Sequence, residues 1–192
     1  MAERTSKVRS LQEATALVKD GDTIAVGGIV STNRPMAILR QLMKERRRDL
    51  SIITFQGGLD IDLMIGLGMV KTLTVSYMGA EALAPVTPFY ARRACDGGLE
   101  IEEVDLGTVL FMLRARAQRL PFLPSWGPVG TSLPKLNPRL KVIEQSLNCH
   151  TRPGKTGCAM HHVRIHANDI VHSKIISTPS SSEQWMPLAT AA

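Results

Sequence analysis

Aromatic residues, cysteines and long apolar runs are all scarce in this sequence of 192 residues. Aromatic side chains make up 4% of the chain and do not interleave with its basic residues, which disfavours a nucleic-acid-binding surface. The three cysteines, Cys95, Cys149 and Cys158, form no even disulfide framework. No uncharged apolar run reaches the roughly 18 residues that a membrane-spanning helix needs, and Met1–Ser6 lacks the layout of a secretory signal. We therefore expect a protein of the reducing cytoplasm.

The rest of the composition is that of an ordinary globular domain. Apolar residues make up 44% of the chain and charged residues 21%, and the chain is long enough to bury a core. Part of the net charge of +6 lies in Lys44 and Arg46–Arg48, at the predicted end of a helix. Cations there complement the helix dipole, so we interpret this run as a solvated helix end rather than a polyanion site.

Short apolar strands alternate with amphipathic helices in the first hundred residues. A strand is followed by two glycines twice, at Gly27-Gly28 and at Gly57-Gly58. This alternation predicts an α/β fold with a mostly parallel sheet and helices on both faces. Ligands bind such sheets at the loops that follow the carboxyl ends of the strands. The predicted strands are 23–26, 50–55, 72–77 and 99–104, and the predicted helices begin at Ser10 and Pro35 or span 60–68, 88–95 and 108–118.

The pattern is less regular after about residue 125. A stiff Pro-containing segment (120–124) is followed by a predicted strand (140–143), a loop-like stretch (148–162), strand-like pieces (163–176) and a solvated tail (177–192). Cys149, Cys158 and the five histidines lie in this part of the chain, but their spacing matches no zinc-binding pair. We therefore predict no metal site.

One motif is more specific than the general pattern. Residues 20–28, Asp-Gly-Asp-Thr-Ile-Ala-Val-Gly-Gly, followed by Pro35, resemble the amino-terminal signature of the family I CoA-transferases. The chain departs from that family at Ile29 and Asn33, where Phe and Gly are usual. Further blocks, at 70–79, 98–102 and 117–124, resemble the family in the same order. The resemblance predicts an α-type domain over residues 1–145 and a diverged or truncated segment over 146–192.

The resemblance implies an acyl-CoA site at the loops after the strands. Members of the family move CoA between carboxylic acids through a thioester on an enzyme glutamate, a step that needs oriented donors for a tetrahedral oxyanion. Coenzyme A thioester is then the substrate, and no permanently bound cofactor is expected. The substrate-binding residues that the resemblance implies are Gly27, Gly28, Asn33, Arg34, Gln56, Gly57, Gly58, Tyr77, Gly79 and Ser132. Each glycine could equally serve a tight turn, and Gln56 could equally cap a loop.

The reactive glutamate is expected on another chain. In the two-chain members it lies on the β-type chain, within a Glu-x-Gly-type loop that has no counterpart here. The resemblance therefore implies a β-type partner, in a heterodimer or heterotetramer, and no binding to nucleic acid or membranes.

Two alternatives stay open. The segments 34–36, 120–124 and 130–134 look like the α subunits of ring-opening CoA-ester hydrolases of steroid catabolism, whose α chain carries a glutamate where this chain has Leu106. Leu106 cannot act as a base, and its neighbour Asp105 is interpreted as a helix N-cap. The second alternative is a truncated subunit without catalytic activity. A sugar-phosphate isomerase or ligand sensor on the same fold is disfavoured, since no Asp/Lys/Glu set of the isomerase kind is visible.

Overall fold

The computed structural model describes residues 8–146, 159–166 and 174–176. The chain divides into two compact units, unit 1 within residues 1–102 and 172–192 and unit 2 within residues 103–171. Among the helices of these described residues, none is long and apolar enough to cross a membrane. The predicted boundary at residue 145 concerns similarity to a family rather than compactness, and it stays a prediction.

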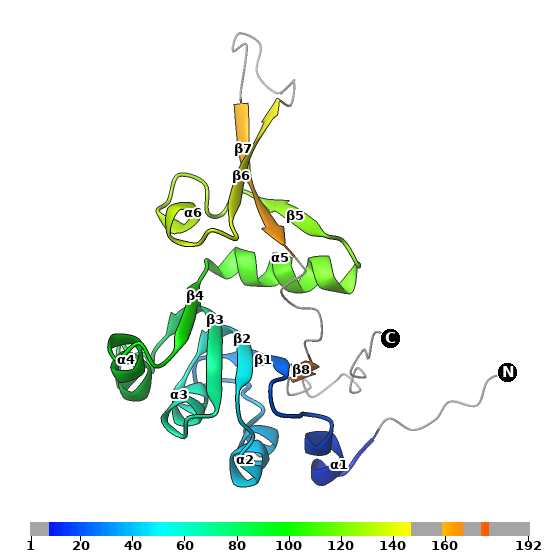
Figure 1. Ribbon diagram of the computed structural model, residues 1–192, viewed down its shortest axis with the longest axis vertical. Coiled ribbons are helices and arrows are strands. Elements are labelled where there is room, and N and C mark those ends of the chain that lie inside the picture. The colour runs from blue at the N-terminus through cyan, green and yellow to red at the C-terminus, as the bar shows by residue number, and fades with distance from the viewer. Residues whose placement is uncertain (1–7, 147–158, 167–173, 177–192) are drawn as a thin grey trace, which may run out of the picture. The chain divides into compact units, whose positions relative to one another are not determined.

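Unit 1 contains a five-stranded sheet in the order β4-β3-β2-β1-β8 (Figure 1). Its elements are α1 (Leu11–Ala16), β1 (Thr23–Ile29), α2 (Met36–Glu45), β2 (Leu50–Gly57), α3 (Leu59–Gly66), β3 (Val70–Met78), α4 (Pro88–Cys95), β4 (Glu100–Glu103, at the unit boundary) and β8 (Lys174–Ile176). β1 pairs in parallel with β2 and β8, and β2 pairs in parallel with β3. The predicted α/β class, with a mostly parallel sheet and alternating helices, is confirmed.

The three central strands of unit 1, β1, β2 and β3, are buried on both faces. Ile24, Ile52 and Leu73 lie in register on β1, β2 and β3, are fully buried and belong to the main apolar cluster. The alternate residues Ala25 and Ile53 point to the other face and are only 4% exposed. This two-sided burial explains why these strands are nearly continuous apolar runs in the sequence.

Helix α1 begins as its sequence predicts but ends early. Ser10 Oγ accepts a hydrogen bond from Glu13 N (3.2 Å), and the Glu13 carboxylate accepts one from Ser10 N (2.8 Å), which is the predicted capping box. Ser10 N and the Ser10 hydroxyl (2.9 Å) both donate to the Glu13 carboxylate, and these two hydrogen bonds hold the pKa of Glu13 below its usual value. The helix ends at Ala16, so Leu17 is its C-cap residue and is 48% exposed. Thr15 is buried in its place and donates to Glu45 (2.7 Å) on α2.

Unit 2 contains a three-stranded antiparallel sheet in the order β5-β7-β6. Its elements are α5 (Leu106–Ala117), β5 (Phe122–Ser125), α6 (Leu133–Leu136), β6 (Lys141–Ser146) and β7 (Ala159–His166). The segment predicted as merely stiff forms β5, and Pro124 is tolerated there because β5 is an edge strand. The loop predicted to extend to residue 162 is also wrong in part, since β7 begins at residue 159. β7 pairs with β5 on one side and β6 on the other, and this hydrogen bonding forms a strand that its largely polar sequence does not indicate.

Candidate functional site

The carboxyl ends of β1, β2 and β3 meet at one edge of unit 1. Ile29 pairs with Gln56, and Gln56 pairs with Tyr77, so the three residues form a row across neighbouring strands. Beyond that row, Gly79 N donates a hydrogen bond to Gly57 O (3.2 Å). Nine of the ten predicted substrate-binding residues lie in these strand ends or in the turns that follow them. They are Gly27, Gly28, Asn33, Arg34, Gln56, Gly57, Gly58, Tyr77 and Gly79.

The turn after β1 folds tightly back on itself. β1 runs through both of its glycines rather than stopping before them, and its pairing with β2 becomes irregular there. Ile29 and Thr32 then exchange two main-chain hydrogen bonds, of 3.0 and 2.7 Å. Gly28 has φ +100°, and a Cβ at this position would lie 2.6 Å from Arg34 Cδ. The turn therefore needs glycine for both its conformation and its space.

Arg34 holds the turns of this edge together from inside the protein. Its Nε donates to Asp60 Oδ2 at 2.7 Å, and its Nη2 lies 2.6 Å from the same oxygen. Its Nη1 donates to Gly28 O and to Gln56 O, each at 3.2 Å. The Arg34 and Asp60 side chains are only 3% and 2% exposed. The guanidinium is thus committed to protein groups from β1, β2 and α3, and it acts on this edge by positioning them.

Gln56 and Tyr77 are the accessible polar side chains of the row. Within the described residues, the half-buried Gln56 amide makes no side-chain hydrogen bond, which gives no support to the loop-capping interpretation. Tyr77 is 36% exposed, its hydroxyl donates to Pro85 O at 3.4 Å, and its ring lies against Gly79. Asn33 is exposed, with φ +54°. The edge therefore offers amide and hydroxyl groups to a ligand.

Helix α3 begins at this edge without a side-chain cap. Gly58 is its N-cap, and the backbone of Gly58 packs so closely on the Val30 carbonyl that no side chain would fit. The first main-chain amides of a helix have no partner within the helix and favour negative charge. An oxyanion that forms at this edge would find hydrogen-bond donors there.

Two buried carboxylates on α3, those of Asp60 and Asp62, were not predicted from the sequence. Asp60 binds Arg34, whereas Asp62 accepts hydrogen bonds from Tyr90 N (2.8 Å) and Phe89 N (3.4 Å) and so caps helix α4. The α4 N-cap residue itself, Thr87, makes no capping side-chain bond. The sequence did contain a signal for the burial of the two acids. In residues 59–65 they lie among the apolar residues of a short helix, at positions that face the core.

Three other predictions fall on unit 2 or on the late part of the chain. Ser132 is exposed before α6 and belongs to unit 2, so its role stays a prediction. Asp105 accepts a hydrogen bond from Thr108 N (3.1 Å) at the start of α5, which confirms the N-cap interpretation. Within the described side chains, no group of three or more His, Cys, Asp or Glu could hold a metal. The side chains of Cys149, Cys158 and the five histidines lie outside that description.

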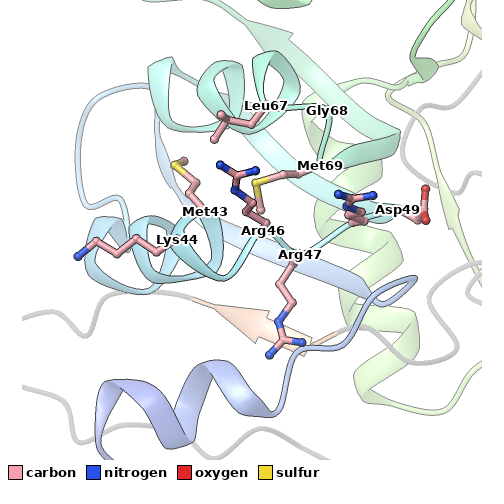
Figure 2. Close-up of a pocket in the computed structure, with 9 residues that line it drawn as sticks. Met43, Lys44, Arg46, Arg47, Asp49, Leu67, Gly68 and Met69 are labelled. Carbon is pink, nitrogen blue, oxygen red and sulfur yellow. The ribbon is translucent and has the colours of Figure 1, made fainter.

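A hollow of about 840 Å³ lies at the opposite end of the strands, next to the residues that precede β2 and β3 (Figure 2). It is lined by Met43, Lys44, Arg46, Arg47, Arg48, Asp49, Leu67, Gly68 and Met69. Lys44 and Arg47 point in different directions in Figure 2, so the cations do not converge on one point. Arg46 is the left-handed C-cap of α2, with φ +54°. These features support the interpretation of a solvated helix end.

The comparisons with known proteins agree with the motif at the glycine-rich edge. Residues 8–157 match the family described as Coenzyme A transferase. The "Cholesterol ring-cleaving hydrolase IpdA subunit" of Mycobacterium tuberculosis is 33% identical over 129 residues, which are 67% of this chain and 44% of that protein. The A-type chain of the glutaconate CoA-transferase of Acidaminococcus fermentans is 32% identical over 120 residues, 62% of this chain and 38% of that protein.

The comparison of the fold with solved structures indicates the same family. The crystal structure of glutaconate coenzyme A-transferase from Acidaminococcus fermentans matches with a TM-score of 0.69 at 26% identity, over 84% of this chain and 54% of that chain. The chain thus spans less than half the length of the two curated relatives named above. The family match covers most of the chain and includes the three strand ends, and on this ground the chain belongs to the coenzyme A transferase family.

Proposed function

We propose that this chain is the α-type subunit of a heteromeric enzyme that transfers CoA between carboxylic acids, with the reactive glutamate on a β-type partner. One observation carries the proposal. In this chain of the coenzyme A transferase family, the accessible Gln56 amide and the uncapped start of α3 lie at the same edge of the sheet. The buried Arg34 side chain holds that edge in place. The names of its relatives support it, since several are the A-type chains of CoA-transferases.

The chemistry needs the donors that this edge can offer. The partner's carboxylate attacks the thioester carbonyl carbon, and the carbonyl oxygen becomes an oxyanion. The C–S bond then breaks and leaves an acyl-glutamyl anhydride and CoA thiolate. The thiolate attacks the glutamyl carbonyl carbon, and the first acid leaves as its carboxylate. The same steps in reverse pass CoA from the glutamyl thioester to the second carboxylate. The Gln56 amide and the first main-chain N–H groups of α3 would donate to the oxyanion, which is the step where preorganised donors contribute most. We assign Gly27, Gly28, Gly57, Gly58 and Gly79 the role of letting backbone approach closely, and Asn33, Tyr77 and Ser132 that of contacting substrate.

The test is to co-express the chain with the β-type reading frame nearest to its own and to assay the purified complex with a panel of acyl-CoA esters. We expect no turnover by the chain alone, acceptor-dependent transfer by the complex, and a glutamyl-CoA adduct on the partner by mass spectrometry. Gln56→Ala should lower kcat by about 100-fold, the effect of losing one oxyanion donor. Gln41→Ala, at another half-buried glutamine of unit 1, is the matched control and should leave kcat unchanged. Unchanged kcat in Gln56→Ala would instead indicate that this chain plays no catalytic part.

A ring-opening hydrolase is the second candidate, because the IpdA relative is among the most similar proteins. Its α-chain glutamate has no counterpart at Leu106, which is 41% exposed at the start of α5. Loss of CoA thioester without any acceptor acid would favour hydrolysis, and strict dependence on an acceptor would favour transfer.

A further inference from the structure

Helix α3 buries its two acids and exposes three leucines. Its two acids, Asp60 and Asp62, are 3% and 2% exposed, whereas Leu59, Leu63 and the C-cap residue Leu67 are 50%, 46% and 61% exposed. The three leucines are spaced by four residues and so lie along one side of the helix. The opposite side is buried in the core of unit 1. A helix that is apolar on both sides is normally covered on both sides.

The exposed side of α3 continues beyond the helix. Gly66 lies on the same side, and a Cβ there would meet the ring of Phe89 at 2.8 Å, so Phe89 packs beside the leucines while remaining 41% exposed. At the other end, Leu59 directly follows Gly58, whose backbone packs on the Val30 carbonyl. We call Leu59, Leu63, Leu67 and Phe89 the α3 face. It is uncharged, and it begins at the candidate site.

We infer that the α3 face is the surface on which the β-type subunit docks; this rests on the proposed function. Under that function, the partner must bring a glutamate to the strand ends where the α3 face begins. A second copy of this chain would bring no such glutamate, which makes the β-type chain the occupant. Interfaces between permanently associated subunits are rich in aliphatic and aromatic side chains at their centre and poor in charge there. The four side chains of the α3 face fit that centre.

The experiment compares two lysine variants in the same co-expression. Leu63→Lys places a charge in the middle of the α3 face without lowering helix propensity. Leu17→Lys is the matched control, because Leu17 is 48% exposed and lies at the end of α1. We expect Leu63→Lys to weaken association with the β-type chain at least about tenfold, as loss of a central interface residue does. Leu17→Lys should associate like the unaltered chain, by copurification and by sedimentation.

A second variant separates docking from folding. Leu63→Ala removes apolar surface without adding charge and should weaken association less than Leu63→Lys, while circular dichroism and Tm of both variants alone match the unaltered chain. Equal association of Leu63→Lys and the unaltered chain overturns the inference, as does a homodimer of this chain that Leu63→Lys dissociates. A complex that depends on Leu63 but transfers no CoA overturns the proposed function and leaves the docking surface in place.

Discussion

Gly28 shows what single residues contribute to the candidate site. Its left-handed conformation and the nearby Arg34 side chain both exclude a Cβ, whereas Gly21, with φ +80°, has no neighbour within 4 Å of the point that a Cβ would occupy. A side chain at Gly21 would therefore meet only backbone strain, whereas a side chain at Gly28 would meet both backbone strain and a lack of space. Both belong to unit 1: Gly21 precedes β1, and Gly28 lies near its end.

We expect Gly28→Ala to destabilise unit 1 more than Gly21→Ala does. Gly21→Ala should cost about 1 kcal/mol in the free energy of unfolding, because only the positive φ is strained. Gly28→Ala adds overlap with Arg34 and should cost about 3 kcal/mol or more, by analogy with the breaking of a buried ion pair. Urea unfolding of the two variants measures the difference. Equal losses would show that the turn can open to admit a methyl group without disturbing the ion pair.

The motif predicted which residues share one edge of the sheet better than it predicted the contacts of each side chain. The glycines and Gln56 were predicted from a motif, and the strand ends confirm that they lie at one edge. Arg34 was predicted to contact substrate, but its guanidinium is enclosed by Asp60 and by main-chain carbonyls. No local pattern links positions 34 and 60, because their contact depends on the packing of the turn after β1 against α3.

Among the elements, α5 has the N-cap residue that its sequence predicts, although the helix begins at Leu106 rather than at the predicted residue 108. Asp105 caps it through Thr108 N, and the Asp105 carboxylate also accepts a hydrogen bond from the Thr108 hydroxyl. The same carboxylate lies beside Gly127, where a Cβ would be 2.7 Å from Oδ2. The cap therefore connects the helix to the segment after β5.

Asp105→Ala should lower the free energy of unfolding of unit 2 by about 1 kcal/mol, the usual effect of losing an N-cap. Asp105→Asn keeps an acceptor at the same place and should lose much less. Thermal unfolding followed by circular dichroism distinguishes the two. A large effect of Asp105→Asn on CoA-ester hydrolysis, with Tm unchanged, would instead assign the carboxylate a chemical role.

The caps of other helices were less predictable where the capping group comes from elsewhere in the chain, even for α4, whose predicted span of 88–95 is confirmed. The capping box of α1 is contained in four residues, so the sequence predicts it. The cap of α4 is Asp62 of α3, which is 28 residues before Tyr90 and has no sequence signature. The first half of β7, residues 159–162, was missed for a similar reason, since its hydrogen-bond ladder is supplied by strands on both sides rather than marked by an apolar run.

At the scale of the whole molecule, the two ends of the parallel strands differ in composition and charge. The glycine-rich edge carries the candidate site, and the opposite edge carries the cations around the hollow of Figure 2. The net charge of +6 therefore says little about the ligand, because part of it lies at the end of α2, at the edge away from the site.

We expect the double variant Arg46→Ala and Arg48→Ala to leave the KM for acyl-CoA unchanged in the complex with the β-type chain. The reason is that both residues precede β2, whereas the candidate site follows it. Steady-state kinetics at low ionic strength, where long-range charge effects are largest, are the measurement. A clear rise in KM would show that this edge recognises the phosphates of CoA.

Asp60 and Asp62 also fix the position of α3 within unit 1. Two residues apart on a helix, they point in different directions, one to Arg34 and the turn after β1, the other to the first amides of α4. Neither rotation of α3 about its axis nor sliding along it can keep both contacts. Helix α3 is therefore clamped at two points, between the turn after β1 and the first turn of α4, and its outer side, which we assign to the partner, is presented on a helix of fixed position within unit 1.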